Sequence, residues 1–325
     1  RVGYAAKNFE ALIDLIDDYP EMIMFCSDDK HPDNLAISHI NELVVRAVAK
    51  GKNVFDVLKA ACITPVQHYS MDVGQMQIGD PADFIVVKDL RDFKVLQTYI
   101  DGKLVAEDGK TLIHRIQNPI INNFNTGLKT VEDFKLLAKG NKVRVISALD
   151  GQLITPEIQG EILIKNGMAE SNPQADILKL TVVNRYQEAM PAIAFIKNFG
   201  LKSGAIASSV GHDSHNIIAV GVDDASICRA VNLLIQEKGG ISAVNDTAEL
   251  VLPLPVGGIM SPNDGYEVAH AYTNIDKMAK EMGSSLKSPF MTLSFMALLV
   301  IPDLKLSDKG LFDGQRFEFV NVFLS

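Results

Sequence analysis

The beginning of the chain combines two helical patterns with one short apolar run. Apolar residues recur at i, i+3, i+4 and i+7, the spacing of one helix face, at Phe9, Leu12, Ile13 and Ile16. Residues 22–26 are continuously apolar, which predicts a strand buried on both faces that ends at Asp28 and Asp29. Residues 40–48 show helical spacing again, and Gly51 supplies a stop. This order is typical of the last part of a parallel barrel or doubly wound sheet.

A short helix and a group of strand signals come next. Asn53 is a good N-cap and predicts a helix over residues 54–62 that closes before Pro65. Residues 84–87 are β-rich, and Asp101-Gly102 lies between two apolar runs as in a type I′ hairpin. These signals indicate a small β module.

The remaining residues alternate between strand and helix patterns after a connector over residues 118–140. Residues 225–237 form an amphipathic helix followed by two glycines. Apolar β-type runs occupy residues 143–146, 161–165, 180–183, 205–207 and 217–220. The whole pattern predicts a multidomain chain of α/β and α+β class, divided into residues 1–62, 63–118 and 119–325.

Composition narrows the function classes. The chain has 325 residues, 47% of them hydrophobic, and a net charge of −9 without a basic run, which argues against disorder and against nucleic-acid binding. Apolar stretches are too short for a membrane span. Three cysteines without paired spacing indicate a reducing compartment, so we expect a cytoplasmic protein. Because the first residue is Arg1 rather than Met, we expect that the N-terminus arose by truncation.

The acidic loop, residues 27–32, is the first concentration of functional side chains. An acidic group after a barrel strand can bind a metal or take a proton from metal-bound water, and His31 can bind metal or substrate. The alternative is an Asx-turn that caps the next helix. Cys26 lies in the apolar run and is expected to pack as a small hydrophobe.

The histidine loop, residues 208–216, lies between two apolar β runs, and seven of its nine residues are polar. His212 and His215 with Asp213 between them could bind a metal, orient an imidazole or read a purine edge. The alternative is a solvated loop of turn formers, and two histidines alone do not make a metal site. The other histidines are expected to be structural, and residues 257–261, although rich in glycine, indicate close backbone packing rather than a phosphate site.

Four segments together resemble the bacterial adenine deaminases, a family of metal-dependent amidohydrolases. They are FCSDDKHP at residues 25–32, GAIASSVGHDSHN at 204–216, PFMTLSFMAL at 289–298 and GLFD at 310–313. The likeness covers essentially the whole chain, and GDPADF at 79–84 is similar to the small sheet domain of many amidohydrolases. The resemblance implies the C-terminal end of a (β/α)8 barrel, part of a small β-sandwich module and an α+β C-terminal domain.

The resemblance also implies a reaction and roles for individual residues. The family hydrolyses adenine to hypoxanthine and ammonia in purine salvage, using manganese or iron to activate water. Asp28 matches the aspartate that ligates metal and shuttles a proton. The resemblance implies that His212, Asp213 and His215 contribute to catalysis from a loop that reaches over the barrel mouth. We further expect four residues to bind substrate: Asp29, His31, Ser209 and Asn216.

One departure from the family and several alternatives qualify this interpretation. The family's other metal ligands have no match here, so we expect this chain alone to be inactive. Another amidohydrolase, acting on a different purine or a cyclic amide, fits the acidic loop equally well but does not fit the histidine loop. A non-catalytic binding or assembly module is the third alternative. For partners we expect adenine and a homo-oligomer, and neither nucleic acid nor a membrane.

Overall fold

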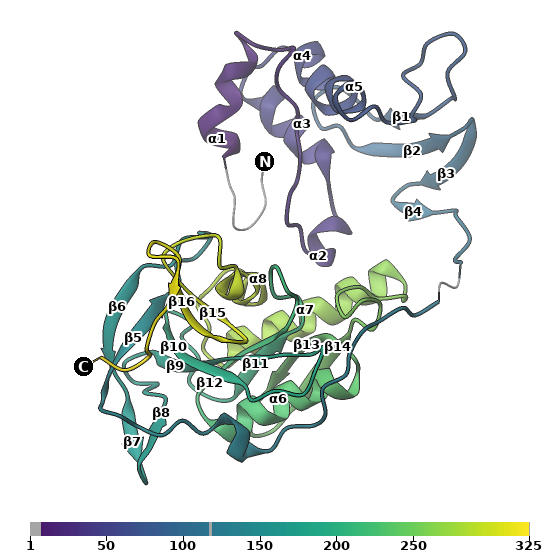
Figure 1. Ribbon diagram of the computed structural model, residues 1–325. Helices are drawn as coiled ribbons and strands as arrows, with labels where there is room; N and C mark the ends of the chain where they lie inside the picture. Colours follow the sequence, from purple (N-terminus) through teal and green to yellow (C-terminus); the bar gives the residue numbers. More distant parts are fainter. Residues whose placement is uncertain (1–7, 117–118, 325) are drawn as a thin grey trace. The chain divides into compact units, whose positions relative to one another are not determined.

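The computed structural model describes residues 8–116 and 119–324 and divides the chain into two compact units (Figure 1). Unit 1 is Arg1–Gln117, and unit 2 is Asn118–Ser325. None of the helices in the described ranges combines the length and the apolar character that crossing a membrane requires. The division that we predicted between residues 62 and 63 lies inside a continuous helical segment of unit 1.

Unit 1 begins with short helices around a small apolar core that includes Ile16, Phe25, Leu43 and Val57. Gly51 has a φ of 81° just after the third helix, as the sequence predicted for its stop. The helical segments are α1 (Phe9–Leu12), the 3-10 turn η1 (Ile13–Ile16), α2 (Pro32–Leu35), α3 (Ile40–Ala49), α4 (Val54–Leu58), the π turn η2 (Lys59–Ile63) and α5 (Thr64–Tyr69).

Two local predictions for unit 1 are wrong. Residues 22–26 belong to no strand, since Met22 lies in a turn and residues 23–26 have no regular secondary structure, and Cys26 is exposed rather than packed. A strand needs a ladder of partners. The Met22 N–H donates instead to the Tyr19 carbonyl at 3.0 Å, within a turn, and the Phe25 N–H donates to the Ala60 carbonyl of a helical segment at 3.0 Å. The helix that starts at the Asn53 cap also does not close before Pro65, because the π turn η2 leads directly into α5 and places the proline in its first turn.

A four-stranded antiparallel meander completes unit 1. Asp101 and Gly102 have φ values of 50° and 72°, which confirms the predicted type I′ hairpin. The described residues of unit 1 contain this one sheet, so a sandwich arrangement stays a prediction. Its strands in spatial order are β1 (Phe84–Val87), β2 (Val95–Ile100), β3 (Lys103–Glu107) and β4 (Lys110–Thr111).

Unit 2 is built on an eight-stranded sheet in which β10 and β5 form the one parallel pair among the described strands. Its centre consists of continuously buried apolar strands, as their sequence predicted. The spatial order is β14 (Glu249–Pro253), β13 (Gly240–Val244), β11 (Ala205–Ser208), β12 (Ile217–Gly221), β9 (Ile177–Val183), β10 (Ala192–Lys197), β5 (Lys142–Ser147) and β6 (Glu157–Glu161).

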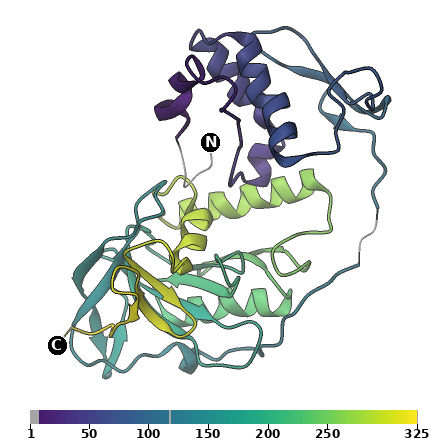
Figure 2. The ribbon, with the colours of Figure 1, turned by 45° about the horizontal axis from the view of Figure 1, so that its top comes forward.

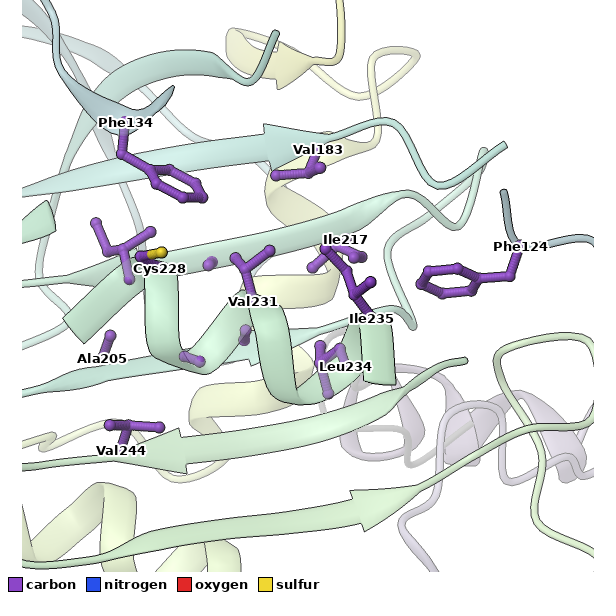
Figure 3. Close-up of a cluster of buried hydrophobic side chains, with 14 residues drawn as sticks. Phe124, Phe134, Val183, Ala205, Ile217, Cys228, Val231, Leu234, Ile235 and Val244 are labelled. Carbon is purple, nitrogen blue, oxygen red and sulfur yellow. The ribbon is translucent and has the colours of Figure 1, made fainter. Parts of the chain in front are cut away.

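Helices cover both faces of this sheet. Figures 1 and 2 show α6 (Asp224–Gln236) on one face and α7 (Gly265–Glu281) and α8 (Pro289–Ser294) on the other. Figure 3 shows the apolar stripe of α6 against β11, β12 and β13, with Phe134 beside it. A small sheet of β15 (Leu304–Ser307), β16 (Gly310–Asp313) and β17 (Glu318–Phe319) packs near β9 and β10.

Two further segments of unit 2 differ in detail from the sequence prediction. The predicted strand at residues 161–165 is interrupted at Ile162, whose buried side chain turns into the core, and its second half, β7 (Leu163–Lys165), pairs with β8 (Met168–Glu170). The weak helical pattern of the connector is a 3-10 turn, η3 (Val131–Phe134). Thr130 and Asp133 form a capping box at the start of this turn, and the turn ends at Lys135, whose backbone is extended.

Candidate functional site

The acidic loop of unit 1 turns sharply at Asp28. This residue is exposed and has a φ of 58°, a left-handed conformation that aspartate tolerates better than most residues. Its carboxylate accepts a hydrogen bond of 3.0 Å from the backbone N–H of Asp29. The geometry of the turn presents the Asp28 side chain on the surface of unit 1, while His31 is buried at the start of α2.

Lys30 anchors the acidic loop to α3. Its ammonium lies 3.0 Å from the carboxylate of Glu42 and 3.3 Å from the hydroxyl of Ser38. The ammonium holds the pKa of Glu42 below its usual value. His39 lies just before α3, with its Nε2 2.9 Å from the Ser27 hydroxyl, and partial desolvation of its ring lowers its pKa. The loop is therefore fixed to the helix that follows it.

A complete metal site is not formed by the residues that the structure describes. Within the ranges 8–116 and 119–324, no three or more His, Cys, Asp or Glu side chains are grouped so that they could hold a metal ion. Asp28 offers one carboxylate, whereas a catalytic metal requires several protein ligands. The predicted role of Asp28 as a metal ligand stays untested, and the described donor set does not fit a metal by itself.

The histidine loop of unit 2 connects β11 to β12 and begins at a buried serine. The Ser209 hydroxyl lies 2.5 Å from the Gly258 carbonyl and accepts a hydrogen bond of 2.7 Å from the Gly240 N–H. The backbone N–H of Ser209 donates to the Gly240 carbonyl at 2.9 Å. Ser209 therefore ties the start of the loop to β13 and to the glycine pair at residues 257 and 258.

His212 and His215 lie close together in the middle of this loop. Their ring centres are 5.6 Å apart in an edge arrangement, and the His212 ring stacks at 4.7 Å on Phe295. The His212 N–H donates to the Ser294 carbonyl at 2.9 Å, which fastens the loop to the end of α8. Asp213 is exposed beside them.

The surroundings of His215 favour the neutral form of its imidazole. Burial lowers its pKa first, and the neighbouring His212 and Arg185 add to this effect, against the opposing charge of Asp213. Its Nδ1 atom is buried and has no hydrogen-bond partner among the described residues. A neutral imidazole offers one donor and one acceptor, which suits recognition of a heterocycle edge.

The far end of the histidine loop is held by residues that sequence reasoning missed. Asn216 is buried, and its side-chain carbonyl accepts a hydrogen bond of 3.2 Å from the Arg185 backbone N–H. The Tyr186 hydroxyl donates to the Ser214 carbonyl at 2.6 Å. Arg185 and Tyr186 follow Asn184 after the predicted strand at residues 180–183, and no sequence motif marks them.

Five of the predicted site residues thus lie in one loop of unit 2: Ser209, His212, Asp213, His215 and Asn216. Asp28, Asp29 and His31 lie in a separate loop of unit 1. The glycine-rich stretch at residues 257–261 is used for close packing, as predicted, because a Cβ on Gly258 would lie 1.7 Å from the Arg185 guanidinium.

Comparisons with known proteins match both units. The model of the adenine deaminase C-terminal domain matches residues 152–318, about half of the chain. The amidohydrolase family model matches residues 2–105, and that family indicates a divalent metal cofactor. Mixed α/β content with these two domains agrees with the predicted fold class, while the barrel and sandwich arrangements stay predictions.

Similar proteins extend along the whole chain. Adenine deaminases from Sulfurovum sp. and Salinibacter ruber are 56% and 52% identical to it over 99% and 100% of its length. That from Methanosarcina barkeri is 50% identical over 99%. The chain spans about 60% of the length of these relatives. The match to the C-terminal domain model and the likeness to these relatives show that the chain belongs to the adenine deaminase family.

Proposed function

We propose that this chain serves the hydrolytic deamination of adenine to hypoxanthine and ammonia. The observation that carries the proposal is the similarity to proteins named adenine deaminase along nearly the whole chain. The structure adds support, because the histidine loop is an ordered polar segment on a rigid sheet, a common setting for functional residues.

Asp28 is the residue that we propose for proton transfer. Hydrolysis requires a water oxygen to bond to C6 of adenine while the water loses a proton. The Asp28 carboxylate accepts that proton and then gives it to the exocyclic N6, and the C6–N6 bond breaks to release ammonia. The second water proton ends on N1 of hypoxanthine. A carboxylate at the surface of its loop can accept and return a proton in this way.

The histidine loop is proposed to recognise the purine. Neutral His215 can donate to or accept from the ring nitrogens, and His212 supplies a second imidazole 5.6 Å from it. Asp213, exposed beside them, can accept a hydrogen bond from an N–H group. The side chains of Ser209 and Asn216 form hydrogen bonds with other residues of the protein, so we propose that they hold the loop in place rather than contact the substrate.

The finer features of the family stay proposals for this chain. We propose that the divalent metal is Mn²⁺ or Fe²⁺, which when bound lowers the pKa of a bound water. We propose a cytoplasmic homo-oligomer that acts in purine salvage. Since no described group of side chains could hold a metal alone, we expect the 325-residue chain by itself to be inactive.

The test is adenine conversion by the product of the complete gene that encodes this chain. The assay compares added Mn²⁺, added Fe²⁺ and a chelator, and it includes guanine and a cyclic ureide as competing substrates. Metal-dependent formation of hypoxanthine and ammonia is the expected result. Turnover of guanine or the ureide with adenine ignored would favour another amidohydrolase and overturn the proposal.

A further inference from the structure

We propose that Arg185 and Tyr186 are positioning residues that fix the histidine loop and orient His215 for adenine. Neither residue is among those predicted from the sequence. The catalytic consequence rests on the proposed function, whereas the effect on the loop itself does not.

A chain of hydrogen bonds connects the two residues to the loop. The Arg185 guanidinium donates from Nη2 to the Tyr186 hydroxyl at 2.9 Å, and that hydroxyl donates to the Ser214 carbonyl at 2.6 Å. The Arg185 backbone N–H donates to Asn216 at 3.2 Å. A cationic donor polarises the phenol and strengthens its bond to the carbonyl. Both neighbours of His215 are therefore held by adjacent residues of one turn.

Arg185 is a buried cation without a carboxylate partner among the described residues. It is only 5% exposed, and its Nε has no described hydrogen-bond partner. Its guanidinium lies 4.7 Å from the ring centre of Tyr186 and 5.8 Å from that of Phe124. Burial of a charge without an opposite charge is costly, and the contacts of the guanidinium with Tyr186, Asn122 and Phe124 offset part of that cost.

The surroundings of Arg185 are shaped to accept it. Gly258 has a φ of 75°, and any Cβ there would collide with the guanidinium. Asn122 contacts Arg185 Nη1 at 3.4 Å and donates to the carbonyls of Lys238 and Pro255. The missing side chain of Gly258 thus leaves space for the Arg185 guanidinium, and Asn122 forms a hydrogen bond with it.

The turn that carries the two residues is itself fastened at both ends. Asn184 donates to Asp308 at 2.8 Å, and Glu188 forms an ion pair with the buried Lys129 and accepts from the Gly127 N–H at 2.9 Å. A fixed turn can transmit its position to the loop through short hydrogen bonds. The charged and titratable groups that act on His215 are His212, Asp213 and Arg185.

The experiment compares Tyr186→Phe, Arg185→Met and Arg185→Lys with the unchanged protein, and uses Tyr19→Phe, an exposed tyrosine, as the control. Two readouts are made on the complete gene product: the NMR titration of the His215 ring and the kinetics of adenine deamination. Arg185→Met is expected to move the His215 midpoint to higher pH, because a neighbouring positive charge is removed. Arg185→Lys keeps the charge and is expected to leave that midpoint near its original value.

Tyr186→Phe is expected to shift the His215 resonances and to lower kcat for adenine roughly tenfold with little change in KM, as loss of orientation does. Arg185→Lys is expected to lose activity similarly, because it cannot keep the same donor geometry. Unchanged His215 resonances in both Tyr186→Phe and Arg185→Met would overturn the inference. Should Arg185→Met fail to fold, Tyr186→Phe, which removes one oxygen atom, decides the test. If the unchanged protein ignores adenine, the proposed function fails, and the NMR readout still decides the positioning role.

Discussion

The two candidate loops differ in how the surrounding chain holds them. The histidine loop joins two strands that pair with each other and with further strands of the same unit, and it is tied at Ser209, His212, Ser214 and Asn216. The acidic loop follows a segment that belongs to no strand, and Lys30 fastens it to α3. Side chains in the first loop are oriented by a sheet, and those in the second by one helix and a turn.

This difference shows that an apolar run becomes a strand only where partners lie in the same unit. Residues 205–208 and 217–221 pair on both sides and are buried. Residues 22–26 have equal apolar character but remain outside any ladder. The variants below are chosen to test the contrast between the two loops.

The largest expected effect is at Asp28, on the acidic loop. Asp28→Asn removes the proposed proton acceptor and is expected to lower kcat for adenine by about 10²- to 10⁴-fold in the complete gene product. Asp18→Asn, an exposed aspartate of the same unit, is the control. A normal kcat for Asp28→Asn would contradict the proposal that the Asp28 carboxylate transfers a proton in the reaction.

The core beneath the strands of the histidine loop is the next test. Phe134 is fully buried against α6, and Phe134→Ala is expected to lower the free energy of unfolding by about 3–5 kcal/mol. Phe55 in unit 1 is 73% exposed, and Phe55→Ala is expected to change it by less than about 0.5 kcal/mol. Urea unfolding measures both. Equal losses would contradict the assignment of Phe134 to the core of unit 2.

A variant of Ser209 distinguishes a structural role of this residue from direct contact with the substrate. Ser209→Ala leaves the Gly240 N–H without its hydroxyl partner and is expected to cost about 1–3 kcal/mol of stability. Ser214→Ala, an exposed side chain in the same loop, is expected to cost much less. Thermal unfolding and KM are measured together. A raised KM for adenine with an unchanged free energy of unfolding would instead indicate that Ser209 contacts the substrate.

The smallest expected effect is the loss, at acid pH, of the stability that Glu42 and Glu188 contribute through their ion pairs. The pKa values of Glu42 and Glu188 are lowered chiefly by hydrogen bonds from Lys30 and Lys129. A carboxyl with a lowered folded pKa stabilises the protein above its ordinary pKa, and this contribution disappears as pH falls through the folded value. Both glutamates are partly exposed, so each effect should stay below about 1 kcal/mol. Glu42→Gln and Glu188→Gln should each reduce the fall in the free energy of unfolding as the pH is lowered. An unchanged pH dependence in both variants would contradict this.

The sequence correctly predicted the structural elements that depend only on residues close together in the chain. The Asp101-Gly102 hairpin and the Asn53 cap follow from residue types that require no distant partner. The predicted end of the 54–62 helix before Pro65 was wrong because the π turn η2 leads directly into α5, whose first turn accepts the proline. Sequence patterns favoured a strand at residues 22–26, since periodicity cannot report whether a ladder partner exists.

The candidate site shows the same limit. His212 and His215 could be selected because they interrupt two apolar runs within a few residues. Arg185 and Tyr186 could not, because their contacts lie about thirty residues further along the chain and arise only when β9 and β12 pair. A lone arginine after a strand has no motif, and its burial beside Gly258 is a tertiary property.

The most direct test of the account is the kcat/KM for adenine of His215→Ala in the complete gene product, with His270→Ala, an exposed histidine on α7, as the control. His215→Ala is expected to lower kcat/KM by about a hundredfold or more, and His270→Ala is expected to keep normal activity. Normal kcat/KM in both variants, with adenine still converted, would contradict the claim that the histidine loop recognises the purine.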